Sequence, residues 1–113
     1  MVVLDASALL ALLFKESGSE RVAAHIRSAC MSTVNLAEAL TRFARDGRPT
    51  AGVIAGLQPF GIEWVVFSET DAARTAELWP FAHQRGLSLG DRACLALALV
   101  RELPVLTADR AWA

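Results

Sequence analysis

The chain has 113 residues, of which 54% are hydrophobic, and this length suits a single domain spanning residues 1–113. Its formal net charge of −1 provides no overall field that attracts nucleic acid, so binding a polyanion would need a local patch or a bound cation. No apolar stretch approaches the ~18 residues of a membrane span, and Asp5 interrupts the apolar start, so we expect a cytoplasmic protein that makes no membrane contact.

The first predicted strand, residues 2–4, is the apolar run Val-Val-Leu. Such a run is typical of a parallel strand that is buried between two layers of helices. A helix is expected directly after it, over residues 6–14. Ser17 with Glu20 predicts a capping box that opens a second helix, extending to about residue 28.

The middle of the chain continues the alternation of strands and helices. Residues 29–32 form a short candidate for the second strand, and residues 34–45 predict a third helix with one apolar face. A short helix over residues 50–57 leads to the third strand candidate, residues 62–67, which is rich in β-branched and aromatic side chains.

Two Ser-x-x-Asp patterns predict further capping boxes, at Ser68 with Asp71 and at Ser88 with Asp91. The first opens a long helix to about residue 85, which Pro80 should kink because proline cannot donate a helical hydrogen bond. The second opens a helix that is apolar on all sides from residue 93 to residue 100, so we expect it to lie deep against the sheet.

Residues 103–107 predict the fourth strand, so single strands alternate with helices along the whole chain. Strands separated by helices form parallel sheets with right-handed crossovers. The expected fold is therefore α/β, with three α/β/α layers around a mostly parallel sheet of about four strands. Cys30 and Cys94 lack the spacing of metal ligands and are expected to be buried, free thiols.

Four acidic residues lie where predicted strands end or predicted helices begin. Asp5 and Asp109 follow strand ends, whereas Glu38 and Asp91 lie in the first turns of helices. If the first and fourth strands are neighbours, all four carboxylates can meet at the carboxyl edge of the sheet, where open α/β sheets bind ligands. Two carboxylates ~4 Å apart repel by about 4 kcal/mol at a typical effective dielectric, so the cluster favours a bound cation.

The chemistry of the ligands narrows the choice of cation. Carboxylate oxygens with no histidine or cysteine among them favour Mg²⁺ or Mn²⁺ over zinc. A hard divalent ion at an open rim can bind a phosphodiester oxygen and lower the pKa of a bound water. Phosphodiester hydrolysis is therefore the function that the four acids favour.

Each acid also has a purely structural interpretation. Asp5 and Asp109 can cap helices, Asp91 with Ser88 matches a capping box, and so does Glu38 with Asn35. Glu38 can also pair with Arg42, one helical turn away. The joint placement of the four acids, and no single position, supports the functional interpretation.

Four segments of the chain resemble the acidic motifs of PIN-domain ribonucleases, in the same order. These are residues 2–8 (VVLDASA), 32–38 (STVNLAE), 87–93 (LSLGDRA) and 105–109 (VLTAD). The short length is similar to that of the VapC toxins of bacterial toxin–antitoxin pairs. The resemblance covers nearly the whole chain, and the ordered set is more specific than any one motif.

The resemblance implies an endoribonuclease that depends on Mg²⁺ or Mn²⁺ and acts as a toxin inhibiting translation and growth. It also implies a homodimer that a cognate antitoxin protein holds inactive. It assigns catalysis and metal binding to Asp5, Glu38, Asp91 and Asp109, with Ser7, Asn35 and Thr107 lining the site.

Two sets of contacts can be expected around such a site. Contacts with the RNA phosphates are expected from nearby arginines, namely Arg42, Arg45, Arg92 and Arg110. Residues 8–14 and 22–29, on the first two helices, can offer an apolar groove to a helix of the antitoxin, although most of these residues also suit ordinary core packing.

One feature departs from the pattern of the VapC toxins. These chains usually continue past the fourth motif into a further helix and strand, whereas only four residues follow Asp109 here. We therefore expect the C-terminal edge strand to be missing, which would weaken the support for Asp109 and for the dimer more than for the other acids.

Two other classes compete with the ribonuclease. A phosphoacceptor receiver domain is also a small α/β fold with an acidic site, but it needs a second acid beside Asp5 and a lysine after the last strand. Ala6 follows Asp5, and the only lysine is Lys15. A PIN-like scaffold that acts only through protein partners would keep the fold and lose the metal.

Overall fold

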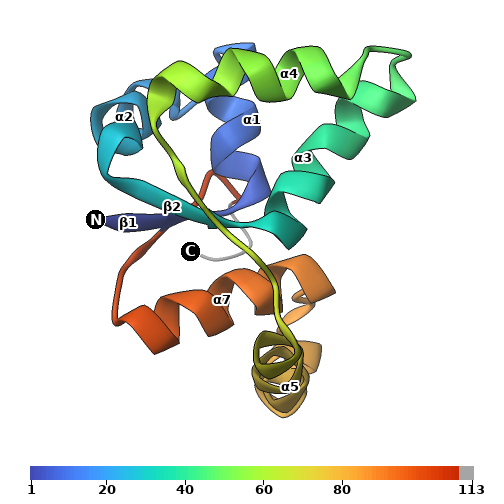
Figure 1. Cartoon of the computed structure of the whole chain (residues 1–113). Coiled ribbons are helices and arrows are strands. Elements are labelled where there is room, and N and C mark those ends of the chain that lie inside the picture. The colour runs from blue at the N-terminus through green and yellow to red at the C-terminus, as the bar shows by residue number, and fades with distance from the viewer. Residues whose placement is uncertain (110–113) are drawn as a thin grey trace.

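The structure is a computed structural model that describes residues 1–109, and its centre is a parallel sheet of four strands (Figure 1). The strand order is β3-β2-β1-β4, and each neighbouring pair is parallel. The strands are β1 (Val2–Leu4), β2 (Ala29–Ser32), β3 (Glu63–Val65) and β4 (Val105–Leu106).

Helices connect the strands and cover both faces of the sheet. In chain order they are α1 (Ala6–Phe14), α2 (Ser19–His25), α3 (Thr33–Arg45), α4 (Thr50–Leu57), α5 (Glu69–Glu77), α6 (Trp79–Ala82) and α7 (Leu89–Arg101). Short 3₁₀ turns follow α2, α4 and α6, at Ile26–Ser28, Gln58–Phe60 and His83–Arg85.

The alternation of side chains along β1 divides the core into two halves. Val2 and Leu4 point toward α1, α2, α3 and α4, whereas Val3 points toward α7. Figure 1 shows the two helical layers on opposite sides of the sheet. Because successive residues of a strand face opposite ways, one apolar strand can contribute to both halves. The predicted three-layer α/β/α fold is confirmed.

The register of the sheet brings the ends of β1 and β4 together. Leu4 pairs with Leu106, so Asp5 and Thr107 follow their strands at the same level of the sheet. The strands that precede Asp5 and Asp109 are therefore neighbours, which is the condition for the two acids to share one edge of the sheet.

Two predicted helices differ from the structure. Ser17 and Glu20 form no capping box, because α2 begins at Ser19 and its N-cap is Gly18, whose φ of 94° suits a residue without a Cβ. The long helix after Ser68 is interrupted and not merely kinked: α5 ends at Glu77, and Pro80 lies in the first turn of α6, where its missing N–H is tolerated.

The expectation that α7 is buried on all sides is wrong. Its inner face, with Cys94, Leu97 and Ala98, packs on the sheet, but Leu99 and Val100 are 64% and 50% exposed. These two side chains border a surface hollow of about 320 Å³, whose lining residues are Arg74, Glu77, Leu78, Ala96, Leu99 and Val100.

Two smaller expectations concern the cysteines and the lack of a membrane-spanning helix. Cys30 and Cys94 are free and buried, as predicted. Burial raises the pKa of the Cys94 thiol, so it stays protonated. Within residues 1–109, every helix is too short or too polar to cross a membrane.

A pair of leucine substitutions tests this core. Leu9 in α1 is fully buried, whereas Leu89 in α7 is 59% exposed. We expect Leu9→Ala to lower the free energy of unfolding by ~2–5 kcal/mol, because it leaves a cavity, and Leu89→Ala to change it by about 0.5 kcal/mol or less. Urea unfolding of the two variants measures the difference, and equal losses would contradict the assignment of the core.

Candidate active site

Asp5 occupies the centre of the candidate site, at the junction of β1 and α1. Its side chain is only 3% exposed, and its Oδ1 accepts a hydrogen bond of 2.8 Å from the backbone N–H of Ala8. Asp5 is thus the N-cap of α1, and the first turn of that helix holds the carboxylate at the carboxyl edge of the sheet.

Two hydroxyl groups complete the hydrogen bonding of this carboxylate. Ser7 Oγ donates to Asp5 Oδ1 at 2.8 Å, and Thr107 Oγ1 donates to Asp5 Oδ2. The backbone N–H of Ala108 donates in turn to Ser7 Oγ at 2.9 Å. Ser7 and Thr107, which were predicted to line the site, therefore contact Asp5 directly and connect the first acidic motif to the fourth.

Glu38 projects from α3 toward α7. As a residue it is exposed, but its carboxylate lies against Asn35 and Gly90. Asn35 Nδ2 donates to Glu38 Oε1 at 2.9 Å and to the carbonyl oxygen of Gly90 at 3.0 Å. The predicted capping box at Asn35 is wrong, because α3 begins at Thr33 and Ser32 is its N-cap.

Asp91 lies in the first turn of α7, where it closes the predicted capping box. Ser88 N donates to Asp91 Oδ2 at 2.9 Å, and Asp91 N donates to Ser88 Oγ at 3.2 Å. The same carboxylate lies near the other two acids, since its charge helps to raise the pKa values of both Asp5 and Glu38. Capping and proximity to the acidic cluster are therefore compatible.

Asp109 follows β4 and is exposed. Its backbone N–H donates to Thr107 Oγ1 at 3.0 Å, and this hydroxyl also contacts Asp5. The fourth acidic motif is thus connected to the first by backbone and hydroxyl groups. The structure places Asp109 at the same edge of the sheet as Asp5.

The electrostatics of the site follow from these positions. Desolvation by burial raises the pKa of Asp5, and the charge of Asp91 adds to this rise. Hydrogen bonds from Thr107, Ala8 and Ser7 lower the pKa but do not cancel the rise. Desolvation also raises the pKa of Glu38, against the hydrogen bond from Asn35, and the charges of Asp91 and Asp5 again add to the rise. In residues 1–109, no lysine or arginine charge contributes to the pKa shift of either carboxylate.

The described residues can be tested for their fit to a divalent ion. No group of three or more histidine, cysteine, aspartate or glutamate side chains in residues 1–109 is arranged, as it lies, to hold an ion. The donor chemistry nevertheless fits Mg²⁺ or Mn²⁺, because every candidate ligand atom is a carboxylate oxygen. A cation would also offset the repulsion between the buried Asp5 and Asp91. Asn35 Oδ1 is also buried without a hydrogen-bond partner in the described part of the chain.

Two of the four arginines expected near RNA, Arg42 and Arg92, have other contacts. Arg42 lies 3.9 Å from Glu16 and its guanidinium covers the ring of Phe14 at 4.2 Å, so it pairs with this glutamate and not with Glu38. Arg92 donates to the carbonyl oxygen of Thr75 at 3.2 Å. Arg45 is exposed at the end of α3, and Arg110 lies outside the described residues.

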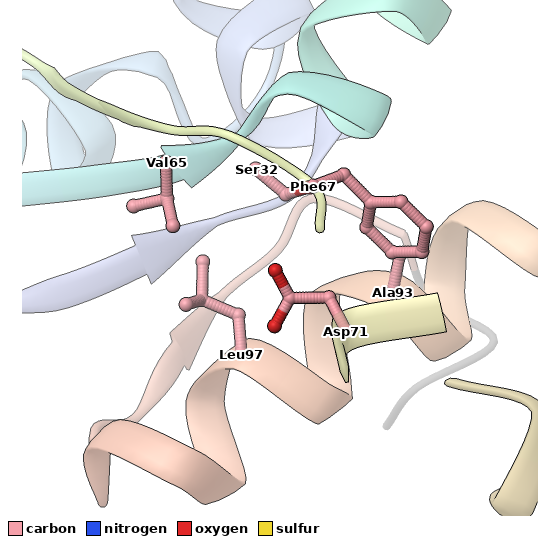
Figure 2. Close-up of a pocket in the computed structure, with 6 residues that line it drawn as sticks. All are labelled: Ser32, Val65, Phe67, Asp71, Ala93 and Leu97. Atoms are coloured by element: carbon pink, nitrogen blue, oxygen red, sulfur yellow. The ribbon is translucent and has the colours of Figure 1, made fainter. Parts of the chain in front are cut away.

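A small cavity lies beside the site, between β3, α5 and α7 (Figure 2). Its volume of about 10 Å³ holds about one water molecule. The residues drawn around it are Ser32, Val65, Phe67, Asp71, Ala93 and Leu97. The cavity is therefore too small for a nucleotide.

The family model described as PIN domain matches residues 2–113. No curated protein matches the chain significantly.

Three solved structures share the fold at low sequence identity. A toxin–antitoxin complex from Klebsiella pneumoniae matches with a TM-score of 0.72 and 18% identity, over 100% of this chain and 91% of the other. VapC20 of Mycobacterium tuberculosis, described as a toxin that cleaves the sarcin–ricin loop, matches with a TM-score of 0.77 and 16% identity, over 97% and 91% of the two chains. A protein of Pyrobaculum aerophilum matches with a TM-score of 0.62 and 24% identity, over 97% and 81%.

The burial of Asp5 leads to a prediction about stability. Because its pKa is raised in the folded state, the stability that Asp5 contributes at low pH is lost as the pH rises through that pKa. At pH 7.5 in a chelating buffer, Asp5→Asn should therefore melt a few degrees above the wild type, since asparagine can cap α1 without a charge. Thermal unfolding measures this, and a lower melting temperature of the variant would contradict it.

Proposed function

This chain belongs to the PIN domain family, and we propose that it is a divalent-metal-dependent endoribonuclease that hydrolyses phosphodiester bonds of RNA. One observation carries the proposal: a buried carboxylate, Asp5, is fixed by Ser7 and Thr107 beside the charges of Asp91 and Glu38. Such a concentration of negative charge opposes folding. Acids with perturbed pKa values of this kind cluster at functional sites.

The proposed metal ligands are Asp5 and Asp91, with Glu38 and Asp109 completing the set. When bound, Mg²⁺ or Mn²⁺ supplies a Lewis acid that attracts the anionic substrate and stabilises charge on the phosphate. Asp5 contributes a carboxylate whose orientation Ala8, Ser7 and Thr107 fix. Glu38, with its raised pKa and exposed position, is suited to accept a proton from an attacking water.

The biological role that we propose is that of a toxin in a toxin–antitoxin pair, inhibiting translation and growth. The similarity to VapC20 and to the Klebsiella pneumoniae complex supports this role and a cognate antitoxin as partner. Ala8, Leu9 and Ala11 are buried in the core. A groove for the antitoxin on α1 would therefore use its half-buried side chains, Leu10, Leu12, Leu13 and Phe14.

The two competing classes, the receiver domain and the scaffold, have different outcomes. Membership of the PIN domain family excludes the phosphoacceptor receiver domain. A scaffold without catalysis has the same fold, and the absence of metal-dependent cleavage would favour it.

Two matched aspartates allow a direct test of the nuclease. Asp91 and Asp71 close matching capping boxes, whose two backbone hydrogen bonds measure 2.9 and 3.2 Å in both, and Asp71 also accepts from Ser68 Oγ at 3.0 Å. Both Asp→Asn variants should lose about the same helix stability, but Asp91→Asn should lower RNA cleavage in Mn²⁺ at least ~100-fold and Asp71→Asn should not lower it.

Cleavage of a labelled RNA by the wild type, Asp5→Asn, Asp91→Asn and Asp71→Asn, with and without EDTA, is the measurement. Asp5→Asn should behave like Asp91→Asn, and EDTA should stop the wild type. Equal activity of Asp91→Asn and Asp71→Asn would leave Asp91 with a capping role alone.

We also propose a homodimer that uses the hollow between α5 and α7. Arg74 and Glu77 stand one turn apart on α5 beside the exposed Leu99 and Val100. Two copies related by a twofold axis, with their α5 helices antiparallel, can place each arginine opposite the other copy's glutamate around an apolar centre.

Leu99→Glu tests this dimer, because it places a charge in the apolar centre of the proposed interface. The wild type should elute and scatter light as a dimer at tens of micromolar, and the variant as a monomer. Val66→Glu is the control, since Val66 is 74% exposed and lies outside the hollow. A monomeric wild type, or a dimeric Leu99→Glu, would contradict the interface.

A further inference from the structure

Glu38 is the one acid of the cluster whose position depends on a contact between two helices. Its carboxylate lies in a notch that Asn35 of α3 and Gly90 of α7 form together. Asn35 is fully buried, and its two N–H groups are directed to Glu38 Oε1 at 2.9 Å and to the Gly90 carbonyl oxygen at 3.0 Å. One side chain therefore connects Glu38 to the helix that carries Asp91.

Gly90 forms the floor of this notch because it has no Cβ. A Cβ built at Gly90 would overlap the carboxyl carbon and both carboxyl oxygens of Glu38. The backbone of Gly90 does not itself require glycine, since its φ is not among the positive values in the chain. Glycine also weakens a helix relative to alanine, so space for Glu38 is what this position provides.

The notch holds the Glu38 carboxylate against forces that would move it away from Asp5 and Asp91. Asp5 and Asp91 repel its charge, and an exposed glutamate on a helix has many solvent-facing rotamers. Without a donor and a fitted cavity, the carboxylate would turn toward water. Asn35 supplies the donor, and Gly90 supplies the cavity.

We propose that Asn35 and Gly90 are positioning residues that hold the Glu38 carboxylate beside Asp91, and that this contact between α3 and α7 sets the geometry of the acidic site. The consequence for catalysis rests on the proposed nuclease function. The contact itself is a property of the folded chain and can be tested separately.

Gly90→Ala is the primary test, with Gly56→Ala as its control. Gly56 lies inside α4, where an added Cβ meets nothing within 4 Å. Since the atoms that Gly90→Ala would strike belong to the flexible end of Glu38, the fold should survive and the carboxylate should move. Gly90→Ala should lower Mn²⁺ affinity and kcat at least ~10-fold with an unchanged KM for RNA, a typical effect of removing support from a ligand. Gly56→Ala should change neither.

Two readouts keep the test independent of RNA cleavage. Isothermal titration with Mn²⁺ measures metal affinity, and the NMR resonances of the Asn35 side-chain amide report its hydrogen bonds directly. These amide resonances should shift in Gly90→Ala and stay in place in Gly56→Ala. Thermal unfolding in chelating buffer should show that both variants fold.

A second background tests the steric argument. Aspartate at position 38 is one methylene shorter and leaves room for a Cβ at position 90. Gly90→Ala should therefore lower Mn²⁺ affinity at least ~10-fold in the wild type but less than about threefold in Glu38→Asp. Equal losses in the two backgrounds, or an unchanged Asn35 amide in Gly90→Ala, would overturn the proposal. A wild type that cleaves no RNA would instead refute the nuclease and leave the amide comparison valid.

Discussion

The architecture of the site depends on keeping one carboxylate out of water at the end of β1. Asp5 is 3% exposed, and three donors compensate for the water that it loses: Ala8 N–H and the hydroxyls of Ser7 and Thr107. Thr107 can reach it only because β4 pairs with β1, and Ala8 only because α1 begins immediately after the strand. Strand order and helix capping therefore converge on a single side chain.

This arrangement stabilises the position of Asp5 without neutralising its charge. The donors are uncharged. The charge of Asp91 helps to raise the pKa of Asp5, and the charges of Asp91 and Asp5 help to raise the pKa of Glu38. A site of this kind is strained electrostatically in the folded chain, and a cation relieves that strain. The demand for positive charge thus comes from the fold itself, which supports the proposed metal site.

Local patterns in the sequence predict much of this structure, and long-range contacts account for what they miss. The apolar strands, their order in the chain and the capping boxes at Ser68 and Ser88 are local signals, and the structure has them. The contact between Asn35 and Gly90 joins positions 55 residues apart, and no periodicity or motif indicates it. The exposed face of α7 was missed for a related reason, since only packing decides which side of an apolar helix stays uncovered.

The two capping boxes show why a motif alone does not define a site. Asp71 and Asp91 share both backbone hydrogen bonds of the capping box with their own N-cap serines, so their local sequences produce the same type of helix start. They differ in what their helices pack against. The helix of Asp91, α7, packs on β1 and β2 and so brings its first turn to Asp5, whereas Asp71 on α5 lies beside a cavity with room for one water. What distinguishes a candidate ligand from a cap in this chain is therefore whether its helix packs directly on the strand that leads to Asp5.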